Sequence, residues 1–141
     1  MKYRKAEKAD LDQVVRVAST AFEDYLFLKV IKDLVRDPKQ YPSFVEAMMR
    51  ILVKVFLKHH ICLVAEKNDE IYAVALLQKG PIPFRAYLLN GGFGLLKFIS
   101  LKNMLAYFKF MEDTDKELEQ NVDFDWYLML LAVAPKHQRQ G

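Results

Sequence analysis

A polar, basic stretch that ends in glycine follows an uninterrupted apolar run near the end of this 141-residue chain. The apolar run covers residues 126–133, Ala134-Pro135 marks a turn, and Lys136-His137-Gln138-Arg139-Gln140-Gly141 completes the sequence. Loops of this kind present backbone N–H groups to anions. Glycine has no side chain, so the backbone can approach a bound phosphate closely there. The pattern therefore predicts an anion-binding loop suited to a pyrophosphate.

The sequence lacks the motifs of several other classes of enzyme and of metal sites. Gly-x-Ser-x-Gly, Walker and His-Glu-x-x-His motifs are absent, which argues against a serine hydrolase, an NTPase and a zinc protease. One cysteine and three histidines are too few for a disulfide framework or a structural zinc site, so we expect no metal. We interpret His59 and His60 as the end of a helix and His137 as an exposed loop residue.

The elements that must position this loop follow from the spacing of apolar residues. We expect a strand at residues 2–6, helices starting after Asp10 and at Ser43, and a further apolar stripe at 26–34. Two apolar runs, 61–65 and 71–77, flank a polar turn and predict a hairpin. We expect residues 84–118 to be helical with a break at 90–92, and residues 126–133 to form a buried strand. These elements predict one mixed α/β (α+β) domain over residues 1–141.

Val133-Ala134-Pro135 followed by Gln138-Arg139-Gln140-Gly141 resembles the acetyl-CoA motif of the GCN5-related N-acetyltransferase (GNAT) family. That motif is a central strand, Val-x-Pro, then Gln/Arg-x-x-Gly-x-Gly/Ala and a helix. Tyr3-Arg4-Lys5-Ala6 is similar to the family's opening strand, and the 61–77 hairpin lies where its second and third strands belong. Residues 80–122 depart from the simplest members as a helical insertion. The last two motif positions and the helix do not follow here, so we expect a fold incomplete at its C-terminus.

The resemblance implies a mainly antiparallel sheet with helices on both faces. It also implies transfer of an acetyl group from acetyl-CoA to a primary amine of a small molecule or peptide, in a ternary complex. The predicted cofactor-binding positions come from the strand and from the loop. They are Leu131, Ala132 and Val133 for the pantetheine arm and thioester, and Gln138, Arg139, Gln140 and Gly141 for the pyrophosphate.

A general base is harder to assign. An amine protonated at neutral pH must lose a proton before attack, and a carboxylate can accept it. Residues 126–134 carry no ionisable side chain except Tyr127. We therefore take Asp125 and Glu23 as catalytic candidates, with Asp123 and Asp24 beside them.

Two alternatives stay open. Three helices followed by a hairpin is also the order of a winged-helix DNA-binding module, with Arg50, Lys54 and Lys58 on one side of the third helix. The hairpin is apolar on both faces and the net charge is only +3, so we expect no nucleic acid partner. The second alternative is a catalytically silent domain of the same fold that serves interaction or ligand sensing.

The remaining expectations concern location and assembly. Residues 1–10 have no apolar core typical of a signal peptide, and the apolar stretch 84–111 is interrupted by Lys97, Lys102 and Lys109. We therefore expect a cytoplasmic domain without a membrane span. A homodimer is left open.

Overall fold

The computed structural model describes residues 1–21, 34–121 and 127–138. Its helices and strands are β1 (Lys2–Lys5), α1 (Leu11–Ala21), α3 (Tyr41–His59), β2 (Ile61–Lys67), β3 (Glu70–Gln78), α4 (Phe84–Leu89), α5 (Leu101–Asn121) and β4 (Tyr127–Val133). Short 3-10 turns precede α1 and α3, connect α4 to α5 and follow β4. The predicted strands and helices within these ranges are confirmed. Most of the apolar stripe at 26–34 lies outside the described residues.

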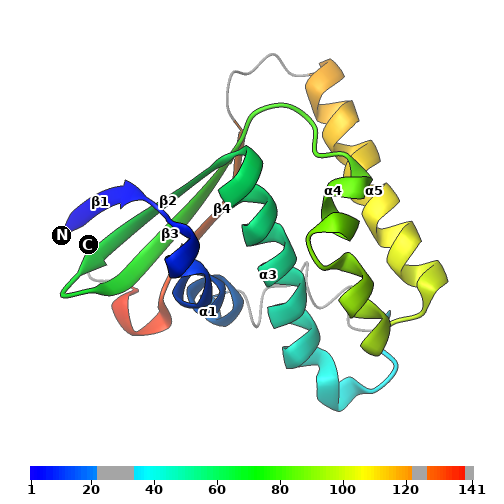
Figure 1. Cartoon of the computed structure of the whole chain (residues 1–141), viewed down its shortest axis with the longest axis horizontal. Helices are drawn as coiled ribbons and strands as arrows, with labels where there is room; N and C mark the ends of the chain where they lie inside the picture. The colour runs from blue at the N-terminus through cyan, green and yellow to red at the C-terminus, as the bar shows by residue number, and fades with distance from the viewer. Residues whose placement is uncertain (22–33, 122–126, 139–141) are drawn as a thin grey trace.

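The four strands form one antiparallel sheet in the order β1-β2-β3-β4 (Figure 1). The hairpin between β2 and β3 turns at Asn68 and Asp69, which both have positive φ, 54° and 63°. Asn and Asp tolerate this left-handed conformation, which two-residue hairpin turns require. β2 and β3 are interior strands, and β4 is an edge among the described strands. The predicted mixed α+β fold with an antiparallel sheet is confirmed.

Helices α1 and α3 pack beside one another on one face of the sheet. Val14 and Ala18 from α1 meet Phe56 from α3 and Val74 from β3 in a core that excludes water. Side chains on the opposite face alternate with these, and Leu131 remains 58% exposed there. We expected helices on both faces, but the described helices that pack on the strands cover one face. The helices after β3 lie against α3 instead.

The segment after β3 is helical with a break, as predicted. Tyr87 of α4 stacks on Phe108 of α5 at 5.2 Å between ring centroids and 7° between planes. A Cβ on Gly92 would lie 2.7 Å from the Tyr87 carbonyl oxygen, so only glycine fits at this position without a shift of the backbone. The break therefore brings α4 and α5 together beside α3, on the side away from the sheet (Figure 1).

Candidate functional site

The outer edge of β4 offers backbone groups that no described strand pairs. Ala134 donates its N–H to the Tyr72 carbonyl at 2.8 Å, and Ala132 stands opposite Val74. Because hydrogen-bonded and non-hydrogen-bonded pairs alternate in an antiparallel ladder, the N–H and C=O groups of Leu131 and Val133 face away from β3. An extended ligand could therefore pair with β4 at Leu131 as an added strand would.

The ladder between β3 and β4 is irregular just before this edge. Leu76 stands opposite Leu130 and Leu77 opposite Leu128, so Met129 has no partner on β3. An extra residue of this kind is a β-bulge, which bends its strand and increases its twist. The bulge therefore turns the last residues of β4 relative to the first ones.

The turn after β4 is held by side chains from the start of β3. The His137 ring stacks on Tyr72 at 3.4 Å between centroids, and Glu70 pairs with the Lys136 ammonium. His137 Nε2 lies 3.7 Å from the same Glu70 carboxylate. The His137 side chain is only 13% exposed, so our expectation of an exposed loop residue is wrong. Sequence spacing could not reveal this, because Tyr72 comes from a distant strand.

The backbone groups of the turn are largely used within it. His137 donates its N–H to the Ala134 carbonyl at 2.8 Å, and Gln138 donates its N–H to the Pro135 carbonyl at 3.3 Å. The Gln138 side chain donates to the outward-facing Val133 carbonyl at 2.9 Å. To bind a phosphate through the Gln138 amide, the chain must first open its bond to Pro135.

The charges at this turn are mostly compensated. The Lys136 ammonium, and then His137, hold the pKa of the Glu70 carboxyl below its ordinary value. Glu70 in turn neutralises the Lys136 ammonium, which precedes the predicted loop.

Cys62, the cysteine on β2, is buried, and burial raises the pKa of its thiol to about 12. This thiol is protonated at neutral pH and is therefore not poised as a nucleophile.

The predicted site residues are described only in part. Leu131 is exposed, Val133 is half-buried, and Ala132 is buried with its backbone directed at β3, so the structure separates Ala132 from the free edge. Gln138 is exposed beside Val133. The other predicted positions lie outside the described residues: Arg139, Gln140 and Gly141 of the loop, and the base candidates Asp125, Glu23, Asp123 and Asp24.

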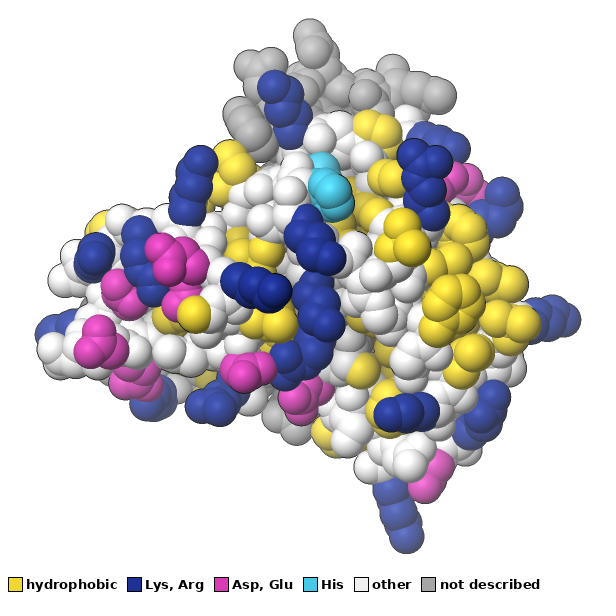
Figure 2. Space-filling model, viewed as in Figure 1, with side chains coloured by type: hydrophobic (Ala, Val, Ile, Leu, Met, Phe, Trp, Pro, Cys, Tyr) yellow, Lys and Arg dark blue, Asp and Glu magenta, His cyan; other side chains and the backbone are white. Residues whose placement is uncertain are grey.

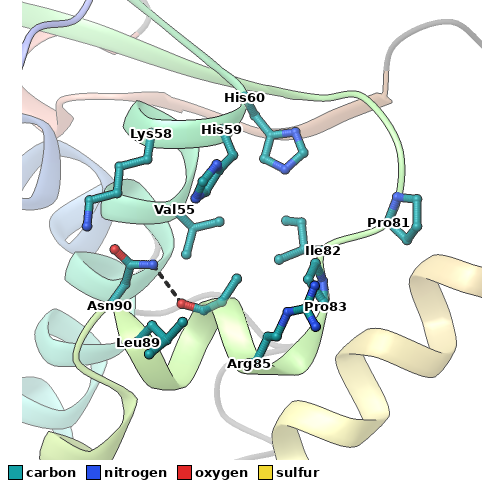
Figure 3. A pocket seen from close by; sticks show the side chains of 11 residues that line it. Val55, Lys58, His59, His60, Pro81, Ile82, Pro83, Arg85, Leu89 and Asn90 are labelled. Carbon is teal, nitrogen blue, oxygen red and sulfur yellow. Dashed lines mark hydrogen bonds between the residues drawn. The ribbon is translucent and has the colours of Figure 1, made fainter.

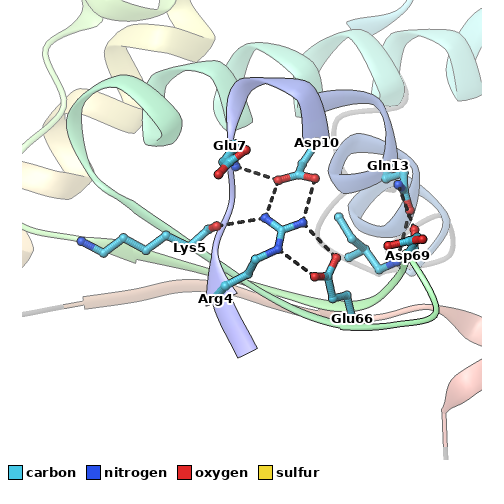
Figure 4. Close-up of polar contacts among 8 residues, drawn as sticks. Arg4, Lys5, Glu7, Asp10, Gln13, Glu66 and Asp69 are labelled. Carbon is cyan, nitrogen blue, oxygen red and sulfur yellow. Dashed lines mark hydrogen bonds and ion pairs between the residues drawn. The ribbon is translucent and has the colours of Figure 1, made fainter. Parts of the chain in front are cut away.

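Sequence reasoning missed an ion cluster at the start of the chain (Figure 4). The Arg4 guanidinium donates to both carboxylate oxygens of Asp10, at 2.7 and 3.0 Å, and to both of Glu66, each at 2.9 Å. Asp10 also accepts the Glu7 N–H at 2.7 Å. Hydrogen bonding to Arg4 holds the pKa values of Asp10 and Glu66 below their ordinary values. Every oxygen is engaged, so the cluster joins β1, β2 and the start of α1 and serves structure.

A scan against models of protein families and a search of the curated proteins both found no match for this chain. Within the described residues, no group of His, Cys, Asp and Glu side chains is arranged to hold a metal ion. Among the helices of those same residues, none combines the length and apolar character needed to cross a membrane.

Proposed function

We propose that this chain is an acetyl-CoA-dependent N-acetyltransferase domain of the GNAT type. The observation that carries the proposal is the outer edge of β4 at Leu131, which no described strand pairs and which lies after a bulge and before a fixed turn. This edge gives the pantetheine arm of acetyl-CoA a strand to pair with. The Gln138-to-Gly141 segment begins where the pyrophosphate would then lie.

The reaction would transfer the acetyl group directly to a primary amine of a small molecule or peptide. The neutral amine nitrogen forms a bond to the thioester carbonyl carbon, the carbon–sulfur bond breaks, and the leaving thiolate takes up the proton that the nitrogen loses after attack. The proton that the protonated amine loses before attack goes to a carboxylate, for which Asp125 and Glu23 remain the candidates. The Leu131 N–H can hold or polarise the thioester side of the cofactor, so positioning supplies most of the catalysis.

The proposal places this reaction in the cytoplasm. One buried cysteine, Cys62, is typical of a reducing compartment.

The DNA-binding alternative gains no support from the site. Arg50 is paired with Asp12 at 2.8 Å and with Glu46 at 3.6 Å, and the hairpin strands are interior strands of the sheet.

Calorimetric titration of the full chain with acetyl-CoA tests the proposal, with two variants at one position. Leu131→Pro removes the outward N–H but no bond to β3, because this N–H faces away from β3. Proline is tolerated at such an edge of a sheet. Leu131→Ala removes the side chain and keeps the N–H. We expect Leu131→Pro to weaken acetyl-CoA binding about tenfold, the loss of one well-placed hydrogen bond and of close approach. Leu131→Ala should bind nearly as the parent chain does.

The results of these titrations distinguish an acetyltransferase from a catalytically silent domain. Absence of binding at millimolar acetyl-CoA, or equal affinity of the parent chain and Leu131→Pro, overturns the proposed site. Thiol release measured with a panel of primary amines then tests catalysis. Binding without thiol release for any amine would favour the catalytically silent domain.

A further inference from the structure

A pocket of about 500 Å³ lies at the opposite end of the sheet from the turn after β4. It is formed where α3 ends, where β3 leads into α4, and along α4 itself (Figure 3). Its size is within the range of pockets that hold small molecules. The predicted acetyl-CoA positions that the structure describes, Leu131 to Val133 and Gln138, lie at the other end of the sheet, so this pocket is a separate feature.

The pocket combines an apolar wall with basic side chains. Val55, Ile82 and Leu89 are among its apolar residues, and Lys58, His59, His60 and Arg85 supply the basic groups. No acidic residue of the described chain lines it. Figure 3 shows the two imidazoles hanging from the end of α3 and the Arg85 side chain rising from α4 across from them. Such a set favours an anionic head group with an apolar body.

Helix electrostatics account for only part of this charge. Lys58 and His59 lie in the last turn of α3, where cations complement the helix dipole. Arg85 lies in the first turn of α4, where a cation gains nothing from the dipole. Glu112 of α5 reaches this turn, and its carboxylate is engaged by the Phe84 N–H and the Lys116 ammonium. The dipole of α4 therefore does not account for Arg85, which is exposed at the pocket.

His60 and Asn90 are oriented as parts of a binding wall. His60 Nδ1 accepts the Lys79 N–H at 3.3 Å, so a neutral His60 carries its proton on Nε2 and can donate it. Asn90 is 6% exposed and donates to the Ala86 carbonyl at 2.7 Å. Its Oδ1 has no hydrogen-bond partner among the described residues. An anion cannot supply a donor to this oxygen, so of these two side chains it is His60, through its Nε2–H, that can donate to an anionic head group.

The surface around the pocket supports approach of an anion. Arg50, Lys54 and Lys58 follow one another at four-residue spacing along α3 and lie on one side of the helix. Figure 2 shows a row of Lys and Arg side chains down the middle of this face, over α3, with histidine at its upper end. Because Arg50 is paired with Asp12 and Glu46, the attraction of anions toward the pocket rests on Lys54 and Lys58.

We propose that this pocket binds a small organic anion. A carboxylate or phosphate group lies between His59, His60 and Arg85, and the apolar body of the ligand packs against the exposed side chains of Pro81, Pro83 and Leu89. The proposal does not depend on acetyl-CoA binding, because the two sites share no residue.

Amide NMR titration of the full chain with three probes of one shape tests this. Benzoate and phenyl phosphate carry the two head groups on the same ring, and benzyl alcohol is their neutral counterpart. We expect saturable shifts at the amides of residues 85–90, with one of the anions bound about tenfold more tightly than the alcohol. Whichever anion binds more tightly identifies the head group.

Two arginine variants locate the charge that matters. Arg85→Gln should weaken binding of the preferred anion about tenfold and leave binding of benzyl alcohol unchanged. Arg16→Gln, at an exposed position on α1, is the matched control and should bind as the parent chain does. The proposal is overturned if neither anion saturates by about 10 mM. It is also overturned if the alcohol binds as tightly as the anions, or if Arg85→Gln and Arg16→Gln behave alike.

Discussion

Phe108 and Phe110 lie two positions apart on α5 and differ sharply in burial. Phe108 is 2% exposed and stacks on Tyr87, whereas Phe110 is 57% exposed. Truncating a buried phenylalanine to alanine leaves a cavity and costs about 3 to 5 kcal/mol of unfolding free energy. Phe110→Ala should change the unfolding free energy by less than about 0.5 kcal/mol. The pair therefore tests whether the helices after β3 belong to the same core as the sheet.

Thermal and urea unfolding followed by circular dichroism measure both variants. We expect Phe108→Ala to lower the melting temperature by about 10 °C in a single transition, because a domain of this size loses roughly 3 °C per kcal/mol. Phe110→Ala should melt within about 2 °C of the parent chain. Equal effects of the two substitutions would refute the placement of α5. A second transition, with the sheet melting at the parent temperature, would show that α4 and α5 unfold separately.

Three further predictions concern the packing and charges around the sites. Burial, and then the neighbouring imidazole, hold the pKa of His60 below its ordinary 6.5, so neutral His60 stabilises the fold above that pH and less as the pH falls. His60→Gln should therefore lose less unfolding free energy than the parent chain in urea titrations between pH 7 and about 5. Asp10, with its pKa held below 3.8 mainly by its guanidinium partner, stabilises the fold above that value and loses this effect in acid. Asp10→Asn should cost about 2 kcal/mol at pH 7 and converge with the parent chain in acid. Gly92→Ala, whose Cβ meets the Tyr87 carbonyl oxygen, should lower the melting temperature, whereas Gly94→Ala, with open space around it, should not.

The local elements could be predicted because their apolar periods are strong. The run at 126–133 is too short and too uniformly apolar for an amphipathic helix, and it forms β4. The start of α3 was less predictable. We expected a helix start at Ser43, but α3 begins at Tyr41, because Asp37 accepts the Lys39 N–H and starts a 3-10 turn that leads into the helix.

The contacts between distant segments could not be predicted from spacing. Arg4 meets Glu66 only because β1 pairs with β2 in one particular register. His137 stacks on Tyr72 because β3 and β4 are antiparallel neighbours. The sequence contains every one of these side chains, but periodicity describes one element at a time. Pairing between elements is what turns isolated polar residues into clusters.

The two proposed sites lie at opposite ends of one interior strand, which makes them independently testable. At its start, β3 supplies Glu70 and Tyr72, which fix the turn after β4. Beyond its other end, the Lys79 N–H orients His60 in the pocket. Because β3 pairs with strands on both sides, removal of the exposed Arg85 head group should not alter the turn. Failure of acetyl-CoA to bind would therefore leave the anion pocket standing, and failure of the anion probes would leave the β4 edge standing.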